Sequence, residues 1–176
     1  MRYRRTDVAG ATYFFTLNLA ERQRTLLTDH IVTLRSVMRN VKQHHPFYMD
    51  AIVILPDHLH CILTLPPEDS DYPMRWNLIK AGFSRCLPRV EQRNLSRVNK
   101  GERGVWQRRY WEHMIRDEHD YARHVDYIHY NPVKHSHVSR AAEWPYSSLH
   151  RYIAAGILTE DWGAGEGKED GAYGER

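Results

Sequence analysis

Two histidines separated by a single residue, His58 and His60, are the side chains of this sequence best suited to bind a metal ion. Alternate side chains of a β-strand face the same side of a sheet, so both imidazoles would share one face while Leu59 faces the core. Neutral imidazole is a good ligand for transition metals. Histidine pairs of this kind also occur on solvated sheet surfaces, so the spacing alone leaves both interpretations open.

A tyrosine and an asparagine four residues apart, Tyr127 and Asn131, form a second pair in a helical stretch. Residues i and i+4 share a helix face, so the phenol and the carboxamide would project together. At about 100° per residue, His124 falls in the same sector. The apolar stripe of this helix lies about a quarter-turn away and comprises Tyr121, Val125 and Ile128. The phase therefore predicts that Tyr127 lies beside the core, where it could be a nucleophile or a packing residue.

The carbonyl oxygen of Asn131, added to the two histidines, would complete a mixed nitrogen and oxygen site. Such a donor set suits Mn²⁺ or, next to a phosphate, Mg²⁺. The chain has two cysteines, Cys61 and Cys86, at a spacing that is typical neither of a zinc site nor of a disulfide scaffold. This cysteine usage indicates a reducing cytoplasm.

The length of 176 residues and the hydrophobic content of 41% predict one folded domain, at most with a small appendage. The longest aliphatic run, 51–55, is far shorter than the ~18 to 20 residues that span a bilayer. The N-terminal residues 1–5 have no apolar segment behind them that could act as a signal peptide. We therefore expect no membrane partner.

The charge of the chain is divided unevenly. The whole chain carries +3, and residues 159–176 hold six acids and two bases, or −4, so residues 1–158 carry +7. We expect residues 1–158 to form the domain and 159–176 to form a flexible, acidic, glycine-rich tail. A basic body with aromatic residues suits a polyanion with stackable bases, although composition alone favours a solvated basic surface with a buried aromatic core. The aromatic residues concerned are Tyr3, Tyr13, Trp76, Trp106, Tyr110 and Trp111.

Hydrophobic periodicity predicts an α+β fold. Strands are expected at 12–19, 47–55, 58–65 and 105–116, and helices at 24–45, 72–87, 117–131 and 144–157. This order is that of a ferredoxin-like, split βαβ antiparallel sheet with helices on it and extra C-terminal helices. The basic segment 89–104 lacks periodicity and is expected to be a mobile loop. Pro132 is expected to end the third helix at Asn131.

Four segments, in this order, resemble the REP-associated tyrosine transposases, which are bacterial relatives of the tyrosine HUH transposases. They are 55–61 (LPDHLHC), 106–113 (WQRRYWEH), 124–135 (HVDYIHYNPVKH) and 144–148 (WPYSS). The resemblance covers roughly residues 1–158. It implies the ferredoxin-like fold, a divalent cation, Mg²⁺ or Mn²⁺, as cofactor, and single-stranded DNA hairpins of REP-type palindromic elements as partners. It also implies a nucleoid-associated, cytoplasmic enzyme that acts as a monomer.

The resemblance further implies a metal site at His58 and His60 and a nucleophile at Tyr127. Related insertion-sequence enzymes have a glutamine where this chain has Asn131, which keeps the amide oxygen on a shorter side chain. The implied reaction is cleavage of single-stranded DNA through a 5′-phosphotyrosine, with rejoining by the reverse step. Helix phase adds His124 as a group that could help Tyr127, whose free pKa is about 10, to ionise. Basic residues expected to contact DNA are Arg4, Arg5, Arg93, Arg97, Lys100, Arg108, Arg109 and Lys134.

Two other functions remain open at this stage. A REP-hairpin-binding regulator that has lost catalysis would show the same basic surface and aromatic residues. It would have no need, however, for four residues converging on one phosphate. A general metal-dependent hydrolase would not need Tyr127 and would leave no covalent adduct.

Overall fold

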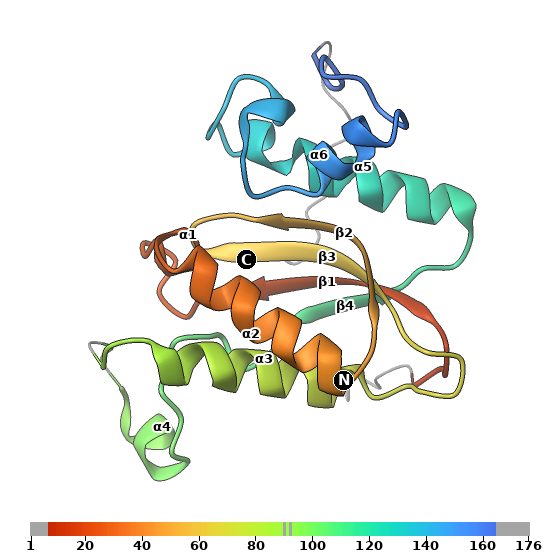
Figure 1. Cartoon of the computed structure of the whole chain (residues 1–176). Helices are drawn as coiled ribbons and strands as arrows, with labels where there is room; N and C mark the ends of the chain where they lie inside the picture. The colour runs from red at the N-terminus through yellow and green to blue at the C-terminus, as the bar shows by residue number, and fades with distance from the viewer. Residues whose placement is uncertain (1–6, 90, 92, 165–176) are drawn as a thin grey trace.

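Four strands form one antiparallel sheet in the order β2-β3-β1-β4 (Figure 1). The computed structural model describes residues 7–89, 91 and 93–164, so Arg4, Arg5 and most of the predicted tail lie outside the described residues. The strands are β1 (Thr12–Asn18), β2 (Tyr48–Ile54), β3 (His58–Thr64) and β4 (Trp111–Met114). Together with the helices they form the expected α+β arrangement.

The strand expected at 105–116 is much shorter than predicted. Within this segment only β4 forms a ladder with β1, and the earlier part contributes a single bridge between Trp106 and Leu19. Trp106 is buried against Phe83 rather than alternating along a ladder. The aromatic and apolar content that predicted a long strand therefore arises from core packing of an irregular segment.

Two helices, α2 (Ile31–His44) and α3 (Tyr72–Cys86), cover one face of the sheet (Figure 1). The single helix expected at 24–45 is wrong, because a short helix, α1 (Leu26–Asp29), precedes α2. The backbone of His30 leaves helical geometry between them, at φ −115° and ψ 35°. The Leu27 N–H donates to the Pro56 carbonyl (3.1 Å), and its side chain is buried. This tertiary contact fixes the direction of the first turn.

The basic segment 89–104 contains a helix, α4 (Leu95–Asn99), where a loop was expected. Asn94 caps it by accepting a hydrogen bond from the Arg97 N–H (3.0 Å). Arg103 pairs with Glu91 and donates to the Leu87 carbonyl (3.2 Å), which ties the segment to the end of α3. The charges that suggested a mobile loop are thus partly used within the fold.

A long helix, α5 (Glu118–Lys134), lies on the opposite face of the sheet (Figure 1). Asp117 caps it by accepting from the Asp120 N–H (2.8 Å), as predicted. The helix does not end at Asn131 but continues through Pro132. Proline removes only its own donor, and the next turns are closed by the His135 N–H to the Asn131 carbonyl (3.0 Å) and the His137 N–H to the Pro132 carbonyl (2.9 Å).

The C-terminal segment closes the outer edge of β2. It contains a 3₁₀ helix, η1 (Ala141–Glu143), and α6 (Leu149–Ala154), which is shorter than the helix expected at 144–157. The Ile54 N–H donates to the Tyr146 carbonyl (2.9 Å), and the Ile52 N–H donates to the Ser148 hydroxyl (2.8 Å). Within the described residues, no helix has the length and apolar content that crossing a membrane requires.

Candidate active site

His58 and His60 lie side by side on β3 and face α5. Their rings are 4.9 Å apart, and in the register of the sheet His58 is opposite Asn18 and His60 is opposite Thr16. Leu59 points to the other face and belongs to the larger core beneath α2 and α3. The alternation predicted from the sequence is confirmed, although both histidines are buried instead of lying on an open surface.

The Nδ1 atom of His58 is held by a carboxylate. It donates to Asp57 (2.7 Å), whose other oxygen accepts from Nε of Arg22 (2.6 Å). Burial opposes ionisation of Asp57, but the His58 hydrogen bond and the charges of His58 and Arg22 outweigh it, so the pKa of Asp57 is lowered. Burial also lowers the pKa of His58, which favours the neutral imidazole. Asp57 therefore fixes the ring so that Nε2 is the nitrogen directed at the site.

The Nδ1 atom of His60 lies 2.8 Å from the Thr16 hydroxyl. Burial lowers the pKa of His60 well below its ordinary value, and the nearby His58 adds to the effect, so this ring too is neutral. Nε2 of His58 is buried and has no hydrogen-bond partner within the described residues. A buried acceptor nitrogen without a partner destabilises the fold unless a ligand binds it. The two neutral imidazoles therefore fit a divalent cation.

Tyr127 packs directly against His60. Their ring centroids are 5.2 Å apart in an edge-to-face arrangement, and Phe14 lies 6.0 Å away on the same side. The predicted place of Tyr127 beside the core is wrong, because it is 8% exposed and belongs to the smaller core between the sheet and α5. The angular position of Tyr127 around the helix could not predict this burial, because α5 also contacts the C-terminal segment. There, Nε2 of His129 lies 2.9 Å from the Ser148 hydroxyl.

Lys134 reaches back along α5 to the Tyr127 hydroxyl. Its Nζ donates to Oη at 3.3 Å and lies 4.8 Å above the centre of the tyrosine ring. Asn131, between them on the helix, is fully buried. The sequence suggested Lys134 as a DNA contact, whereas the structure places its charge at the candidate nucleophile. A cation in this position stabilises a phenolate.

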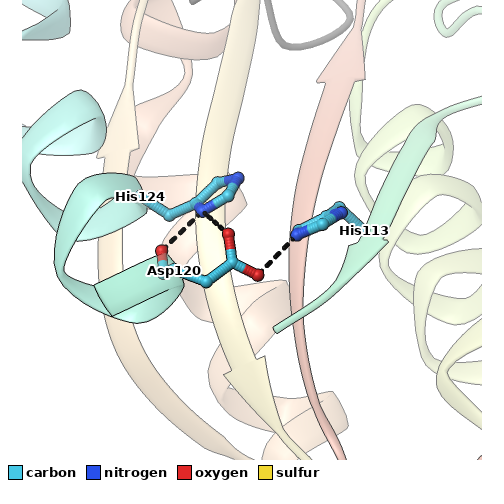
Figure 2. A group of neighbouring side chains, drawn as sticks. All are labelled: His113, Asp120 and His124. Carbon is cyan, nitrogen blue, oxygen red and sulfur yellow. Dashed lines mark hydrogen bonds and ion pairs between the residues drawn. The ribbon is translucent and has the colours of Figure 1, made fainter. Parts of the chain in front are cut away.

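His124 lies in a hydrogen-bonded cluster that joins α5 to β4 (Figure 2). Its Nδ1 donates to the Asp120 carbonyl (2.7 Å) and lies 3.2 Å from the Asp120 carboxylate, which also accepts from His113 (2.8 Å). Burial opposes ionisation of Asp120, but hydrogen bonds from His113 and the Arg116 N–H lower its pKa overall. The direct role of His124 toward Tyr127 stays a prediction, and its clear contribution is to hold the first turns of α5 against the sheet.

His135, at the C-terminal end of α5, is a site residue to which the sequence analysis gave no role. Its ring lies 5.1 Å from that of His58. Burial, together with the charges of His58 and Lys134, lowers its pKa to about 4, so it too is a neutral imidazole. The spacing contains a signal for it, because His135 follows Asn131 by four residues and so shares its helix face.

The basic residues predicted to contact DNA are distributed over two regions. Arg97 donates to the Trp106 carbonyl (3.3 Å), and Arg108 pairs with Glu102 (2.9 Å), both in the segment around α4. Arg93, Lys100 and Arg109 are exposed. Within the described residues, Lys134 is the member of this set that contacts Tyr127. A DNA contact by any member of the set, Lys134 included, stays a prediction.

Comparison with known proteins decides which family has this arrangement. The family model described as "Transposase IS200 like" matches residues 7–131. The Escherichia coli K12 REP-associated tyrosine transposase is 43% identical over 160 residues, covering 91% of this chain and 89% of the relative. This chain belongs to the REP-associated tyrosine transposases. A Haemophilus influenzae protein provisionally given the same name is 48% identical over 162 residues, with 92% of each chain covered.

A solved structure supports the same assignment at the level of the fold. It is described as a REP-associated tyrosine transposase bound to a REP hairpin, and it matches with a TM-score of 0.85 and 41% identity over 100% of this chain and 98% of that one. The present REP-associated tyrosine transposase is thus a DNA transposase by family, with an antiparallel α+β fold. The residues that resemble the family's motifs in sequence, His58, His60 and Tyr127, meet between β3 and α5.

Proposed function

We propose that this transposase cleaves and rejoins one DNA strand beside REP-type hairpins, with Tyr127 as its nucleophile. The observation that carries the proposal is the contact of the Tyr127 ring with His60, together with the Lys134 ammonium 3.3 Å from the tyrosine hydroxyl. A phenol beside two neutral imidazoles has little purpose in a protein that only binds DNA. The REP hairpin bound to the relative of known structure supports the choice of substrate.

The residues that would hold a divalent cation, Mg²⁺ or Mn²⁺, are His58, His60 and Asn131, with His135 close enough to His58 to join them. The unsatisfied Nε2 of His58 and the neutral state of the imidazoles fit such an ion. Bound there, the cation would polarise the scissile phosphate and offset the charge that develops on it. Asp57 and Thr16 orient the histidine rings for this purpose.

The reaction we propose is an in-line transesterification by Tyr127. Its phenol oxygen forms a bond to phosphorus as the bond from phosphorus to the 3′ oxygen of the preceding nucleotide breaks. The products are a 5′-phosphotyrosine and a free 3′ hydroxyl, which takes up a proton. Lys134 stabilises the phenolate before attack. Because the tyrosyl link conserves the phosphodiester bond energy, a 3′ hydroxyl can reverse the step and join strands without ATP.

The test is an SDS-resistant adduct assay. Labelled REP hairpins with single-stranded flanks are incubated with the protein and Mg²⁺ or Mn²⁺, and the covalent product is resolved by electrophoresis. We expect an adduct from the unsubstituted protein and from Tyr130→Phe, a neighbouring tyrosine that serves as the control. We expect none from Tyr127→Phe or His58→Ala. Tight hairpin binding without an adduct in either metal would instead indicate a regulator that binds REP hairpins and has lost catalysis.

Gel filtration of the protein with and without hairpin tests our further proposal that it acts as a monomer.

A further inference from the structure

Trp111 is a tryptophan left exposed at the free edge of the sheet. It lies on β4, the strand at the end of the order β2-β3-β1-β4, and is 44% exposed. Of the other aromatic residues that the sequence offered for stacking on bases, Tyr13, Trp76 and Trp106 are buried in the core. Tyr110 is half-buried and packs edge-to-face on Phe15 (5.9 Å), and Tyr3 lies outside the described residues. Trp111 is therefore the exposed member of that set within the described residues.

The register of the sheet puts Trp111 in the same row as His60. Trp111 is opposite Thr16 on β1, and Thr16 is opposite His60 on β3, so the three side chains share one face. Two strand spacings separate Trp111 from His60, or about 10 Å. A phosphate held at His60 therefore leaves the base of a neighbouring nucleotide within reach of the indole.

The charges around Trp111 favour a nucleic acid strand over an apolar partner. Arg109, two residues before it, is exposed and makes no hydrogen bond or ion pair within the described part of the chain. Arg116, just after β4, pairs with Asp120 (3.4 Å) through a side chain that is still 67% exposed. The other edge of the sheet is closed, because Ser147 bridges to Val53 of β2. An aromatic face between cations at an open edge is the arrangement by which proteins bind unpaired strands.

We propose that Trp111 stacks on an unpaired base next to the cleaved phosphodiester and that Arg109 binds the phosphate of that nucleotide. The inference rests on the proposed function only in taking the Tyr127 site as the point of cleavage. It assigns the edge of β4 to the single-stranded flank, as distinct from the paired stem of the hairpin. Stacking of this kind tolerates any base, so this contact holds the strand in place and adds little sequence specificity.

The first test is equilibrium binding in a Tyr127→Phe background, so that no strand is cleaved. Fluorescence anisotropy compares a REP hairpin carrying single-stranded flanks with the same hairpin without them. Trp111→Ala is expected to weaken binding of the flanked hairpin by about 5- to 150-fold, the range found when a stacking residue is removed. Binding of the unflanked hairpin should not change, and Trp111→Phe should retain most of the affinity.

The matched control is Tyr48→Ala. Tyr48 is an aromatic residue, 65% exposed, on the opposite edge strand β2, and its register partner Thr64 places it two rows away from His60. We expect this variant to bind both hairpins as the unsubstituted protein does. Thermal unfolding of Trp111→Ala and Trp111→Phe shows whether either substitution perturbs the fold.

The second test locates the base. An abasic site is placed at each flank position in turn. At one position it should weaken hairpin binding by the Trp111 protein as much as Trp111→Ala does. At that position it should not weaken the binding of Trp111→Ala any further. The proposal would be overturned if the abasic site and Trp111→Ala reduced affinity additively at every flank position. It would also be overturned if Trp111→Ala reduced affinity equally for the flanked and the unflanked hairpin. A dimer that Trp111→Ala dissociates without changing DNA affinity would assign the edge to a second copy of the chain and would also overturn it.

The two proposals fail separately. If the unsubstituted protein forms the Tyr127 adduct but Trp111→Ala binds the flanked hairpin normally, the stacking site is rejected and the nuclease is retained. If no adduct forms but Trp111→Ala loses affinity only for the flanked hairpin, the nuclease is rejected and the stacking site is retained.

Discussion

Replacing Lys134 by methionine is expected to slow formation of the Tyr127 adduct without removing it. Methionine keeps an unbranched side chain over the tyrosine ring but removes the charge that lies 3.3 Å from the phenol oxygen. If that charge stabilises the phenolate, the loss appears in the rate of the chemical step. If Lys134 only binds DNA, as the sequence suggested, the loss appears in affinity.

The size of the effect follows from the distance. Two unit charges 3.3 Å apart interact by about 5 kcal/mol at an effective dielectric constant of ~20. This is an upper bound, because Lys134 is only partly buried and water screens its charge. A hydrogen bond to a charged group contributes ~1.5–3 kcal/mol. The corresponding decrease in rate is about 10- to 150-fold.

The assay is single-turnover adduct formation with saturating protein, followed from pH 6 to 10. The deficit of Lys134→Met should narrow toward pH ~10, where tyrosine ionises without help. Lys42→Met is the matched control, since Lys42 also lies over an aromatic ring, 6.0 Å from the centre of Phe47, but on the far face of the sheet in α2. A saturated rate for Lys134→Met equal to that of the unsubstituted protein at every pH would refute charge stabilisation of the phenolate.

Three further predictions concern the proposed metal site and the stability of the fold. Mn²⁺ at a hundredfold excess over its dissociation constant should stabilise the fold by ~2.7 kcal/mol. Calorimetry should show that His58→Ala loses this stabilisation. Equal stabilisation of both proteins would exclude His58 as a ligand. Asp120→Asn should lower the free energy of unfolding by ~1.5–3 kcal/mol at pH 7, measured in urea. Because the pKa of Asp120 is lowered by folding, this deficit should be present above the unfolded value of ~3.9 and vanish as pH falls through the folded value. His60 and His124 have pKa values lowered by burial, so stability should fall as pH drops below ~6.5, by at most ~1.36 kcal/mol per pH unit for each; urea midpoints that do not change from pH 7 to 5.5 would contradict this.

Local periodicity was enough to place most of the elements and the candidate site residues within them. Two-residue alternation put His58 and His60 on one face because strand geometry is local, and the four-residue step related Tyr127 to Asn131 for the same reason in a helix. Predictions failed where a distant contact overrides a local preference. The Leu27 bond to Pro56 divides the first helix. The continuation of α5 past Pro132 has a local cause, because His135 and His137 close the last turn on the Asn131 and Pro132 carbonyls.

The amino-acid sequence alone was enough to predict the α+β class, the residue types of the candidate site and the family resemblance, because each depends on neighbours within a few positions along the chain. Which side chains meet depends on the tertiary structure. It buried Tyr127 against His60, brought His135 to His58 and left Trp111 exposed while burying Trp106. Burial and contact depend on how α5 and β4 pack across the sheet, and the two ring contacts named here join residues 67 and 77 positions apart.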